Sequence, residues 1–306
     1  MSIEIIGPEA EARLDWIGLC KAFDTGHRMD RAEIGDTFLY REPDTLLSRA
    51  AWISGMGMAV KTATIFPGNA QAGKPTINGG VNLYSDSDGT LEAVVDFHLV
   101  TKWKTAGDSL HAARMLARPD SRNITIVGAG TVARSMVTAY SAAFPDARFT
   151  VWNRSPEAAG RMEADLGVSA TRDLEAAVRG ADIICTATMA KEPVIRGEWL
   201  QPGQHLDLIG AFRPDMREVD DTALKRARIF VDSRATTLDH IGELKIPLAE
   251  GVIARSDVVA DFYDAPAGAF RRSDPGEITI AKNGGGAHLD LMTARYILER
   301  WQAQRG

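Results

Sequence analysis

A glycine-rich segment near the middle of the chain has the residue types and spacing of a phosphate-binding turn. Gly128, Gly130 and Ala133 form a GxGxxA pattern between the apolar run NITIV and a run of helical periodicity. In a strand–turn–helix unit, the first glycine permits the tight turn, the second lets the backbone approach a pyrophosphate, and the alanine allows close helix packing. The free amide groups at the start of the helix favour an anion. The segment therefore predicts a dinucleotide site.

The residues after the next predicted strand indicate which dinucleotide is bound. A site for NAD usually has Asp or Glu at this point, which binds the ribose 2′-hydroxyl. Here Asn153 takes that place and Arg154 follows it. The asparagine removes a carboxylate that would repel a 2′-phosphate, and the arginine can pair with one. The pair favours NADPH, with NADH as a usable alternative; the other interpretation is that Arg154 is a solvated surface charge.

Two threonines end the apolar run ADIICTAT, which is predicted to form the fourth strand of the same sheet. Ligands of open parallel sheets bind outside the carboxyl ends of the strands. We therefore expect Thr186 and Thr188 to line the nicotinamide pocket. Cys185, in the same run, is expected to be a buried small apolar residue.

Lysines at two positions of the first third of the chain are candidates for binding an anion. Lys61 interrupts the alternating apolar run MAVKTATIF, and Lys104 stands just before a predicted helix over residues 105–117. A buried ammonium group normally meets an anion, because burying it unpaired is costly. The ordinary place for a lysine, however, is a solvated face. From these residues alone both interpretations stay open.

The pattern of the sequence changes near residue 120, which predicts two domains. Before this point the runs are short and alternating, as in strands joined by Gly/Asp turns, and they follow a predicted helix over residues 11–22. After it, strands alternate with helices, which is typical of a parallel sheet covered on both faces. We predict an α/β fold with a Rossmann doubly wound parallel sheet in residues 119–288. Residues 1–118 and a returning helix in residues 289–306 would form the other domain.

The composition argues against several classes of protein. The 306 residues are 45% hydrophobic and 25% charged, which is typical of a globular protein, and the formal net charge of -6 argues against a nucleic-acid partner. No apolar stretch approaches the roughly 18 residues that would span a membrane, and the N-terminus does not resemble a signal peptide. Two cysteines form neither a disulfide framework nor a metal-ligand pattern. We expect a cytoplasmic protein that binds no metal, no nucleic acid and no membrane.

Several segments together resemble the ornithine cyclodeaminase and mu-crystallin family. They are AVKTATIFPGN, VTKWKTAGDSLHAARMLA, ITIVGAGTVA, ADIICTATMAKEPVI, HLDLIGAFRPDMREVD and AKNGGGAHLD, and they cover nearly the whole chain. The resemblance implies a discontinuous α+β domain for dimerisation and substrate binding, a Rossmann domain, and an active site between them. It also implies a homodimer.

Matched position by position, the resemblance implies roles for residues of the first domain. Lys61 matches the lysine that binds the substrate carboxylate, and Lys104 falls where many members have an arginine. Thr76 matches a threonine of the substrate pocket. The family's early carboxylate-binding arginine has no clear counterpart, because Asp and Thr stand at residues 36–37. Arg49 is the proposed substitute, so that Lys61, Lys104 and Arg49 are the expected catalytic cations.

On the cofactor side, the resemblance implies roles for residues of two turns and one strand end. Thr131 and Val132 match residues on the pyrophosphate turn, and Asn153 matches the position of the ribose-binding acid. Asn283 and Gly285 match a late turn beside the cofactor.

Phe212 is the departure that most affects the predicted chemistry. The cyclodeaminases carry a catalytic aspartate in a Gly-Ala-Asp turn after the fifth strand, whereas this chain has Gly210, Ala211 and Phe212. A general base contributes about 10²–10⁴-fold to proton transfers such as those of ring closure, and a phenyl ring contributes nothing. Hydride transfer to a preformed cyclic imine needs chiefly orientation. Phe212, on the cofactor side, would help to keep the pocket dry.

The sequence therefore predicts NAD(P)H-dependent reduction of a small cyclic imino acid. The expected substrates are Δ1-pyrroline-2-carboxylate and, in addition, Δ1-piperideine-2-carboxylate, which would give L-proline and L-pipecolate. The segments GAFRPDMREVD and VTKWKTAGDS resemble the reductase branch of the family. The alternatives are a lyase of the ornithine cyclodeaminase or hydroxyproline dehydratase type, a mu-crystallin-like protein that binds NADPH and a ligand with little turnover, and reductive amination of an open-chain keto acid.

Overall fold

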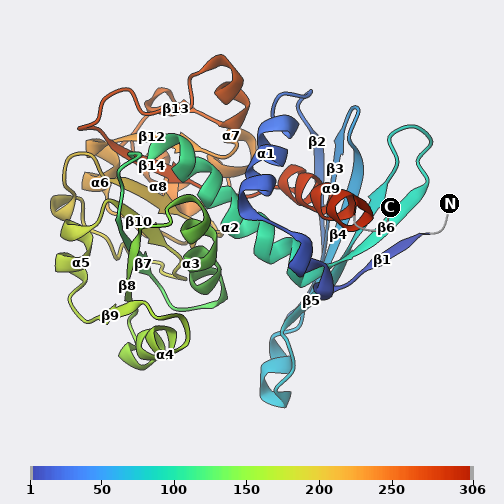
Figure 1. Ribbon diagram of the computed structural model, residues 1–306, viewed down its shortest axis with the longest axis horizontal. Helices are drawn as coiled ribbons and strands as arrows, with labels where there is room; N and C mark the ends of the chain where they lie inside the picture. The colour runs from blue at the N-terminus through green and yellow to red at the C-terminus, as the bar shows by residue number, and fades with distance from the viewer. Residues whose placement is uncertain (1–2, 304–306) are drawn as a thin grey trace. The chain divides into compact units, whose positions relative to one another are not determined.

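The computed structural model describes residues 3–303, which fall into two compact units (Figure 1). Unit 1 comprises the residues up to 104 together with those from 286, and unit 2 comprises residues 105–285. The boundaries predicted from the sequence lie at residues 118/119 and 288/289. The first division lies within one continuous helix, α2 (Phe97–Leu116), whose last turns pack into the core of unit 2. The predicted boundary at residues 118/119, in the loop after this helix, therefore lies later in the chain than the division at residues 104/105.

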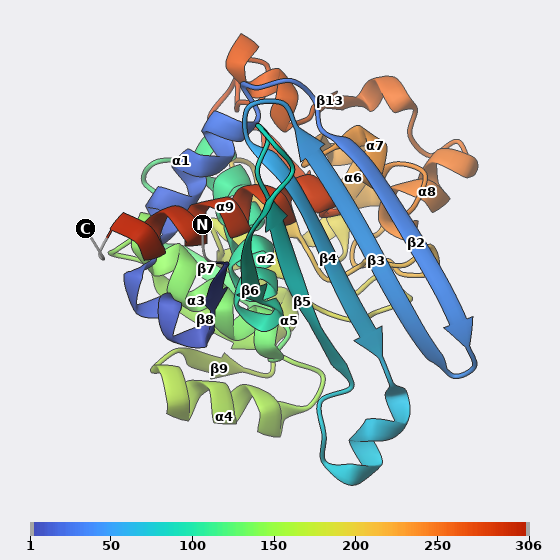
Figure 2. The same cartoon turned by 90° about the vertical axis from the view of Figure 1, so that its right-hand side faces the viewer.

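Unit 1 is built on a six-stranded sheet with the order β1-β6-β5-β4-β3-β2. Neighbouring strands are antiparallel except β1 and β6, which are parallel. Figure 2 shows β2 to β5 as long neighbouring strands, with the hairpin between β4 and β5 carrying a short helical turn at its end. The strands are β1 (Glu4–Ile6), β2 (Glu33–Arg41), β3 (Asp44–Ile53), β4 (Gly57–Ile65), β5 (Ile77–Tyr84) and β6 (Leu91–Asp96).

Strand β4 shows how the alternating sequence determines the two faces of this sheet. Ala59, Lys61 and Ala63 are buried, whereas Met58 and Val60 between them are only half-buried. The strand predicted for this run is therefore confirmed. The last helix, α9 (Ala287–Ala303), packs against the strands and against α1, and the sheet face that carries Lys61 is the buried one. The side chain of Lys61 thus lies on the covered face of the sheet.

Aspartate caps set two helix starts in unit 1. Helix α1 (Trp16–Gly26) begins after Asp15, whose carboxylate accepts a backbone amide at 2.5 Å, so the helix predicted over residues 11–22 starts later than expected. Helix α2 begins after Asp96, whose carboxylate accepts another backbone amide at 2.7 Å. Helix α2 therefore starts at Phe97, eight residues before the start of the helix predicted over residues 105–117.

Unit 2 contains an eight-stranded sheet with the order β13-β12-β14-β11-β10-β7-β8-β9, and every neighbouring pair in it is parallel. From β7 the chain winds outward through β8 and β9 and then returns to β10 on the other side of β7, which creates the switch point of a Rossmann fold. The carboxyl ends of all strands consequently share one edge. The strands are β7 (Asn123–Val127), β8 (Arg148–Trp152), β9 (Ser169–Thr171), β10 (Ile183–Thr186), β11 (His205–Leu208), β12 (Ala227–Val231), β13 (Val258–Ala260) and β14 (Ile278–Lys282).

A proline marks the start of one helix of unit 2. Pro156 occupies the first position of α4 and follows the N-cap residue Ser155. The hydroxyl of Ser155 donates to Glu157 rather than accepting a backbone amide. The helices are α3 (Thr131–Ala143), α4 (Pro156–Leu166), α5 (Leu174–Gly180), α6 (Asp221–Arg226), α7 (Arg234–Thr237) and α8 (Gly242–Ala249). Short 3-10 helices occur at Pro8–Arg13, Pro67–Ala72, Gly197–Trp199, Arg255–Asp257 and Phe262–Ala267.

The centre of the parallel sheet is buried on both faces. All four residues of β10 are buried, including Cys185, as the sequence predicted. This burial explains why the strand reads as a continuous apolar run. Over residues 3–303, no helix combines the length and the apolarity needed to cross a membrane.

Candidate active site

Strand β7 ends in the predicted glycine turn. Gly128 has a φ of +123°, which L side chains rarely adopt, and a Cβ there would lie 2.6 Å from the carbonyl oxygen of Ala187. Gly130 differs, because a Cβ on it would meet no protein atom within 4 Å. Ala133, in the first turn of α3, is fully buried. The turn therefore needs Gly128 for its own fold, whereas the space beside Gly130 is open to a ligand.

A cavity of about 350 Å³ adjoins this turn. The first amides of α3 have no side-chain cap, so they are available to a phosphate group. Thr131 is exposed and Val132 is half-buried at this helix start. The cavity joins the start of α3, which suits a phosphate group, to the end of β8. Its lining residues are Gly128, Ala129, Gly130, Trp152, Asn153, Arg154, Ser155, Ala187, Thr188, Met189, Ala190 and Val194.

The end of β8 presents an amide and a guanidinium group to this cavity. The side-chain nitrogen of Asn153 donates to the carbonyl of Ser155 at 3.0 Å, which fixes the asparagine within its own loop. Arg154 is exposed and has no ion-pair partner within residues 3–303. An arginine on a cavity wall without a protein carboxylate beside it is suited to an anionic ligand.

The two threonines at the end of β10 differ in position. Thr188 lines the cavity, but Thr186 is fully buried, and its hydroxyl donates to the carbonyl of Asp207 at 3.4 Å. The reason is that Thr186 still lies within the strand, between β7 and β11, whereas Thr188 lies beyond the strand end. The structure therefore brings only one of them to the predicted pocket.

One buried carboxylate organises the segments after β10 and β11. Glu218 is fully buried, and its oxygens accept four hydrogen bonds of 2.7–3.1 Å. Oε1 accepts from the amide and the hydroxyl of Thr188, and Oε2 accepts from the amides of Gly210 and Ala211. Four donors thus converge on the two oxygens of this side chain. Glu218 thus fixes the backbone that precedes Phe212, whose own side chain is 58% exposed.

Lys282 and Glu243 extend this buried network. The ammonium group of Lys282 donates to three backbone carbonyls at the ends of β11 and β14, at 2.7–2.9 Å. Burial lowers the pKa of Lys282, while the charges of Glu218 and Glu243 oppose that shift. Glu243 accepts the backbone amide of Glu218 at 2.7 Å. Burial and the charge of Glu218 raise the pKa of Glu243 to about 7, against the effect of Lys282.

The turn after β14 holds the two late residues for which the resemblance implied a cofactor role. Asn283 is buried, and its side-chain amide donates to Asp108 at 2.9 Å. Gly285 has a φ of +69°, and its backbone amide donates to Asp232 at 2.5 Å. Both residues therefore lie at the carboxyl edge of the sheet, held by carboxylates of unit 2.

In unit 1, Lys61 lies on the buried face and meets a protein carboxylate. Its ammonium group donates to Oδ1 of Asp290 at 2.8 Å and lies 4.8 Å from the centre of the Phe97 ring. Lys61 is 8% exposed and Asp290 is 1% exposed. Burial lowers the pKa of Lys61, and the charge of Asp290 opposes this shift. Burial would raise the pKa of Asp290, but the charges of Lys61 and Lys104 outweigh it and lower that pKa.

Two further cations accompany this pair. Register pairs Arg49 of β3 directly with Lys61 of β4, so both side chains emerge on one face of the sheet. The guanidinium group of Arg49 donates to Asp36 on β2 through Nε at 3.3 Å and Nη2 at 2.6 Å. Lys104 is half-buried on α2, and its charge contributes to lowering the pKa of both Lys61 and Asp290. These three cations face two carboxylates, Asp36 and Asp290, so the cluster has one net positive charge and suits a small carboxylate ligand.

Thr76 is not brought to this cluster within unit 1. It lies just before β5, at the end of the β4–β5 hairpin, where its carbonyl accepts the amide of Phe66 at 2.7 Å. Lys61 pairs with Val81, five residues further along β5. Five residues of strand span about 16 Å. The pocket role of Thr76 stays a prediction.

The residues 51–305 match the model of the Ornithine cyclodeaminase/mu-crystallin family. The chain belongs to this family. The family assignment made from the sequence is thus confirmed, and the match covers the strand with Lys61, the glycine turn, the Glu218 network and the helix with Asp290.

A curated relative and two solved structures match almost the whole chain. Delta(1)-pyrroline-2-carboxylate reductase of Paracoccus denitrificans is 52% identical over 298 residues, which cover 94% of either chain. The structure of Thermococcus litoralis Delta(1)-pyrroline-2-carboxylate reductase in complex with NADH and L-proline has a TM-score of 0.89 at 25% identity, over 99% of this chain and 98% of that one. An archaeal alanine dehydrogenase dimer with bound NAD has a TM-score of 0.90 at 28% identity, over 100% and 98%.

Sequence reasoning missed two carboxylates of this family member. Asp290 stands in the segment AKNGGGAHLD, and with Ala287, Leu291 and Ala294 it follows the spacing of one helix face. An acidic residue on an otherwise apolar face is a signal that would have singled it out. Glu218 lies among the charged residues of the run MREVDD and gives no such signal, because its partners are 7 to 30 residues away.

Proposed function

We propose that this protein catalyses the NAD(P)H-dependent reduction of Δ1-pyrroline-2-carboxylate to L-proline, and of Δ1-piperideine-2-carboxylate to L-pipecolate. The observation that carries the proposal is the buried pair of Lys61 and Asp290 with Arg49 and Lys104 beside it, because this cluster can hold the carboxylate of such a substrate. The relative from Paracoccus denitrificans, named for the first of these reactions, supports the assignment.

The residues of unit 1 bind and orient the substrate in this proposal. Lys61 and Lys104 hold its carboxylate, and Arg49 assists through Nη1, since Nε and Nη2 already bind Asp36. Thr76 is assigned to the substrate pocket on the family resemblance. Fixing the carboxylate fixes the neighbouring imine carbon, and orientation is the chief requirement for hydride transfer.

The residues of unit 2 hold the dinucleotide. The amides after Gly130, at Thr131 and Val132, bind the pyrophosphate, for which Gly128 shapes the turn. We assign to the nicotinamide end of the site the residues Thr188, Phe212, Asn283 and Gly285. Thr186 instead is buried in the sheet, where its hydroxyl donates to the carbonyl of Asp207 on the neighbouring strand. When bound, the reduced nicotinamide supplies the hydride.

We propose NADPH as the preferred cofactor and NADH as a usable one. Arg154 lines the cavity and pairs with no carboxylate among residues 3–303, so it is available to a 2′-phosphate. Asn153 replaces the acid that would repel that phosphate. The relatives with solved structures are described with NADH or NAD, so the preference rests on these two side chains.

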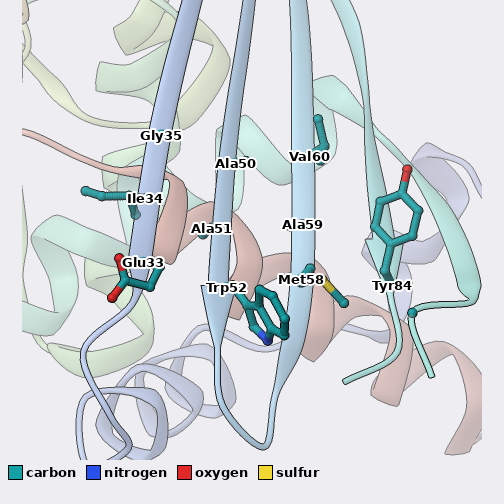
Figure 3. Close-up of a pocket in the computed structure, with 11 residues that line it drawn as sticks. Glu33, Ile34, Gly35, Ala50, Ala51, Trp52, Met58, Ala59, Val60 and Tyr84 are labelled. Atoms are coloured by element: carbon teal, nitrogen blue, oxygen red, sulfur yellow. The ribbon is translucent and has the colours of Figure 1, made fainter. Parts of the chain in front are cut away.

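We further propose that the protein is a homodimer that uses the outer face of the six-stranded sheet. A hollow of about 430 Å³ lies on this sheet, and Figure 3 shows Trp52 and Met58 side by side on neighbouring strands. Tyr84 pairs with Met58 on the next strand, and the exposed residues Leu39 and Leu46 pair further along the same face. Exposed apolar surface of this extent marks an interaction site. The archaeal alanine dehydrogenase, described as a dimer, supports a second copy as the partner. Light scattering behind a sizing column measures the assembly directly.

The test of the activity is NADPH oxidation with freshly prepared Δ1-pyrroline-2-carboxylate, followed by chiral identification of L-proline. Activity with the cyclic imine and little with pyruvate plus ammonium supports the proposal. Reductive amination of pyruvate as the main activity would instead favour an alanine dehydrogenase, to which the chain is also similar. Release of ammonia from L-ornithine with catalytic NAD would establish a cyclodeaminase. Absence of imine turnover between pH 6 and 9 refutes the proposal.

A further inference from the structure

We propose that Asp290 receives the positively charged nitrogen of the substrate, so that unit 1 binds the cyclic iminium carboxylate as a zwitterion. The inference rests on the proposed function, which accounts for the carboxylate of the substrate but assigns no partner to its nitrogen. Asp290 would thereby be a catalytic residue, in contact with the reacting C=N group.

The hydrogen bonding of Asp290 leaves one oxygen for this purpose. Oδ1 accepts the ammonium group of Lys61 at 2.8 Å. Oδ2 is buried and accepts no hydrogen bond from any residue in the described part of the chain. A buried carboxylate oxygen without a donor is costly, and such groups are rare in folded proteins. An N–H⁺ group of a ligand would satisfy it.

The charges of the cluster are compatible with this assignment. Asp36 neutralises Arg49 through two hydrogen bonds, which leaves Lys61 and Lys104 against the single charge of Asp290. His288 and His27, which also belong to unit 1, have pKa values lowered by burial and add no charge near neutral pH. Asp290 repels carboxylates, so it weakens the binding of a simple anion at this cluster. A zwitterion can place its carboxylate on the lysines and its cation on Asp290, so that each of these groups meets an opposite charge.

The reaction explains why such a contact is useful. The imine carbon accepts a hydride readily only when the nitrogen is protonated, because the electron pair of the C=N bond then moves onto a cationic nitrogen. The iminium becomes a neutral secondary amine, which takes up a proton from solvent and leaves as the ammonium form of the product. An adjacent carboxylate favours the protonated nitrogen before and after this step.

The test compares two ligands that differ only in the ring atom. L-Proline carries an ammonium nitrogen, whereas (S)-tetrahydrofuran-2-carboxylate has an ether oxygen that is neither charged nor a donor. Both are titrated calorimetrically into the NADPH-saturated protein, in which neither can react. Asp290→Asn should raise the dissociation constant of L-proline by about 10- to 100-fold, the range of one hydrogen bond between charged groups. The constant of the ether should change less than about threefold, because Asp290 makes no hydrogen bond to it.

A merely structural role gives a different outcome. If Asp290 only holds Lys61 in place, Asp290→Asn weakens both ligands equally, and this result overturns the proposal, as does no change in either. Asp36→Asn is the matched control, since it frees Arg49 and should affect both ligands alike. If Asp290→Asn does not fold, the two ligands are compared in the wild-type protein alone. The wild-type protein should bind L-proline about tenfold more tightly than the ether. Equal affinities overturn the proposal. Failure of the wild-type protein to reduce the imine refutes the proposed function separately, because the ligand comparison needs no turnover.

Discussion

Replacing Lys61 by methionine tests how strongly the buried ion pair contributes to the fold. Methionine keeps most of the side-chain length and removes the charge. The ammonium of Lys61 lies 2.8 Å from Asp290, and both side chains are more than nine-tenths buried. Removing one partner of such a pair leaves an uncompensated charge, which costs about 3–5 kcal/mol. The free energy of unfolding at pH 7, measured by urea denaturation, should fall by that amount.

The loss should depend on pH in a defined direction. In the wild-type protein the pKa of Asp290 is held below its ordinary value, so its stabilising effect is present above the unfolded pKa of about 4 and is lost as the pH falls through the folded pKa. In Lys61→Met the largest opposing charge is gone and burial dominates, which raises the pKa of Asp290. Protonation of Asp290 at acid pH then removes the uncompensated buried charge from the variant. The difference between the two proteins should therefore shrink as the pH falls from 7 to 4.

The double variant Lys61→Met/Asp290→Asn distinguishes a charge effect from a packing effect. A neutral pair leaves no buried charge, so the double variant should lie within about 1–2 kcal/mol of the wild-type protein. Lys74→Met, at an exposed position, is the control and should change stability by less than about 0.5 kcal/mol. The reasoning is refuted if the double variant is as unstable as the sum of the two single variants, or if the pH has no effect.

Three further substitutions test the cofactor side. Arg154→Ala should raise the Michaelis constant for NADPH about 10- to 100-fold, and that for NADH less than about threefold, in steady-state assays with either cofactor. Gly128→Ala should abolish NADPH binding, measured by fluorescence titration, and destabilise unit 2 by about 1–3 kcal/mol, because its φ is +123° and the new Cβ meets a carbonyl oxygen. Glu218→Gln turns an amide NH₂ toward backbone donors, so the free energy of unfolding should fall by about 1–3 kcal/mol and NADPH affinity should fall with it. Unchanged thermal unfolding in Glu218→Gln would contradict the role given to that network.

The parts of the site that could be predicted from the sequence are those made by neighbouring residues. The segment from Val127 to Ala133 contains its strand end, its glycines and its helix start within seven positions, so the pattern and the structure agree. Asn153 and Arg154 were likewise located by the strand they follow. In each case the feature, a tight turn or a strand end, is determined by consecutive residues and can be recognised from them.

The parts that could not be predicted depend on pairing between distant segments. The ion pair of Lys61 and Asp290 joins residues 229 positions apart. Strand β2 was not predicted, because all nine of its residues are exposed and the run EIGDTFLYR has no buried face to read. Its register with β3 nevertheless places Asp36 beside Arg49 and so decides how much positive charge remains for a ligand.

The backbone of the turn around Phe212 is fixed independently of the side chain at that position. Glu218 holds the amides of Gly210 and Ala211, and Lys282 binds the carbonyl of Ala211, so the backbone does not depend on the side chain at position 212. That side chain is 58% exposed. A carboxylate can therefore be present here, as in the cyclodeaminases, or absent, as in this chain, without refolding the turn. The groups assigned to the substrate carboxylate are half-buried or buried and held within unit 1, so the proposed hydride transfer needs no carboxylate at position 212.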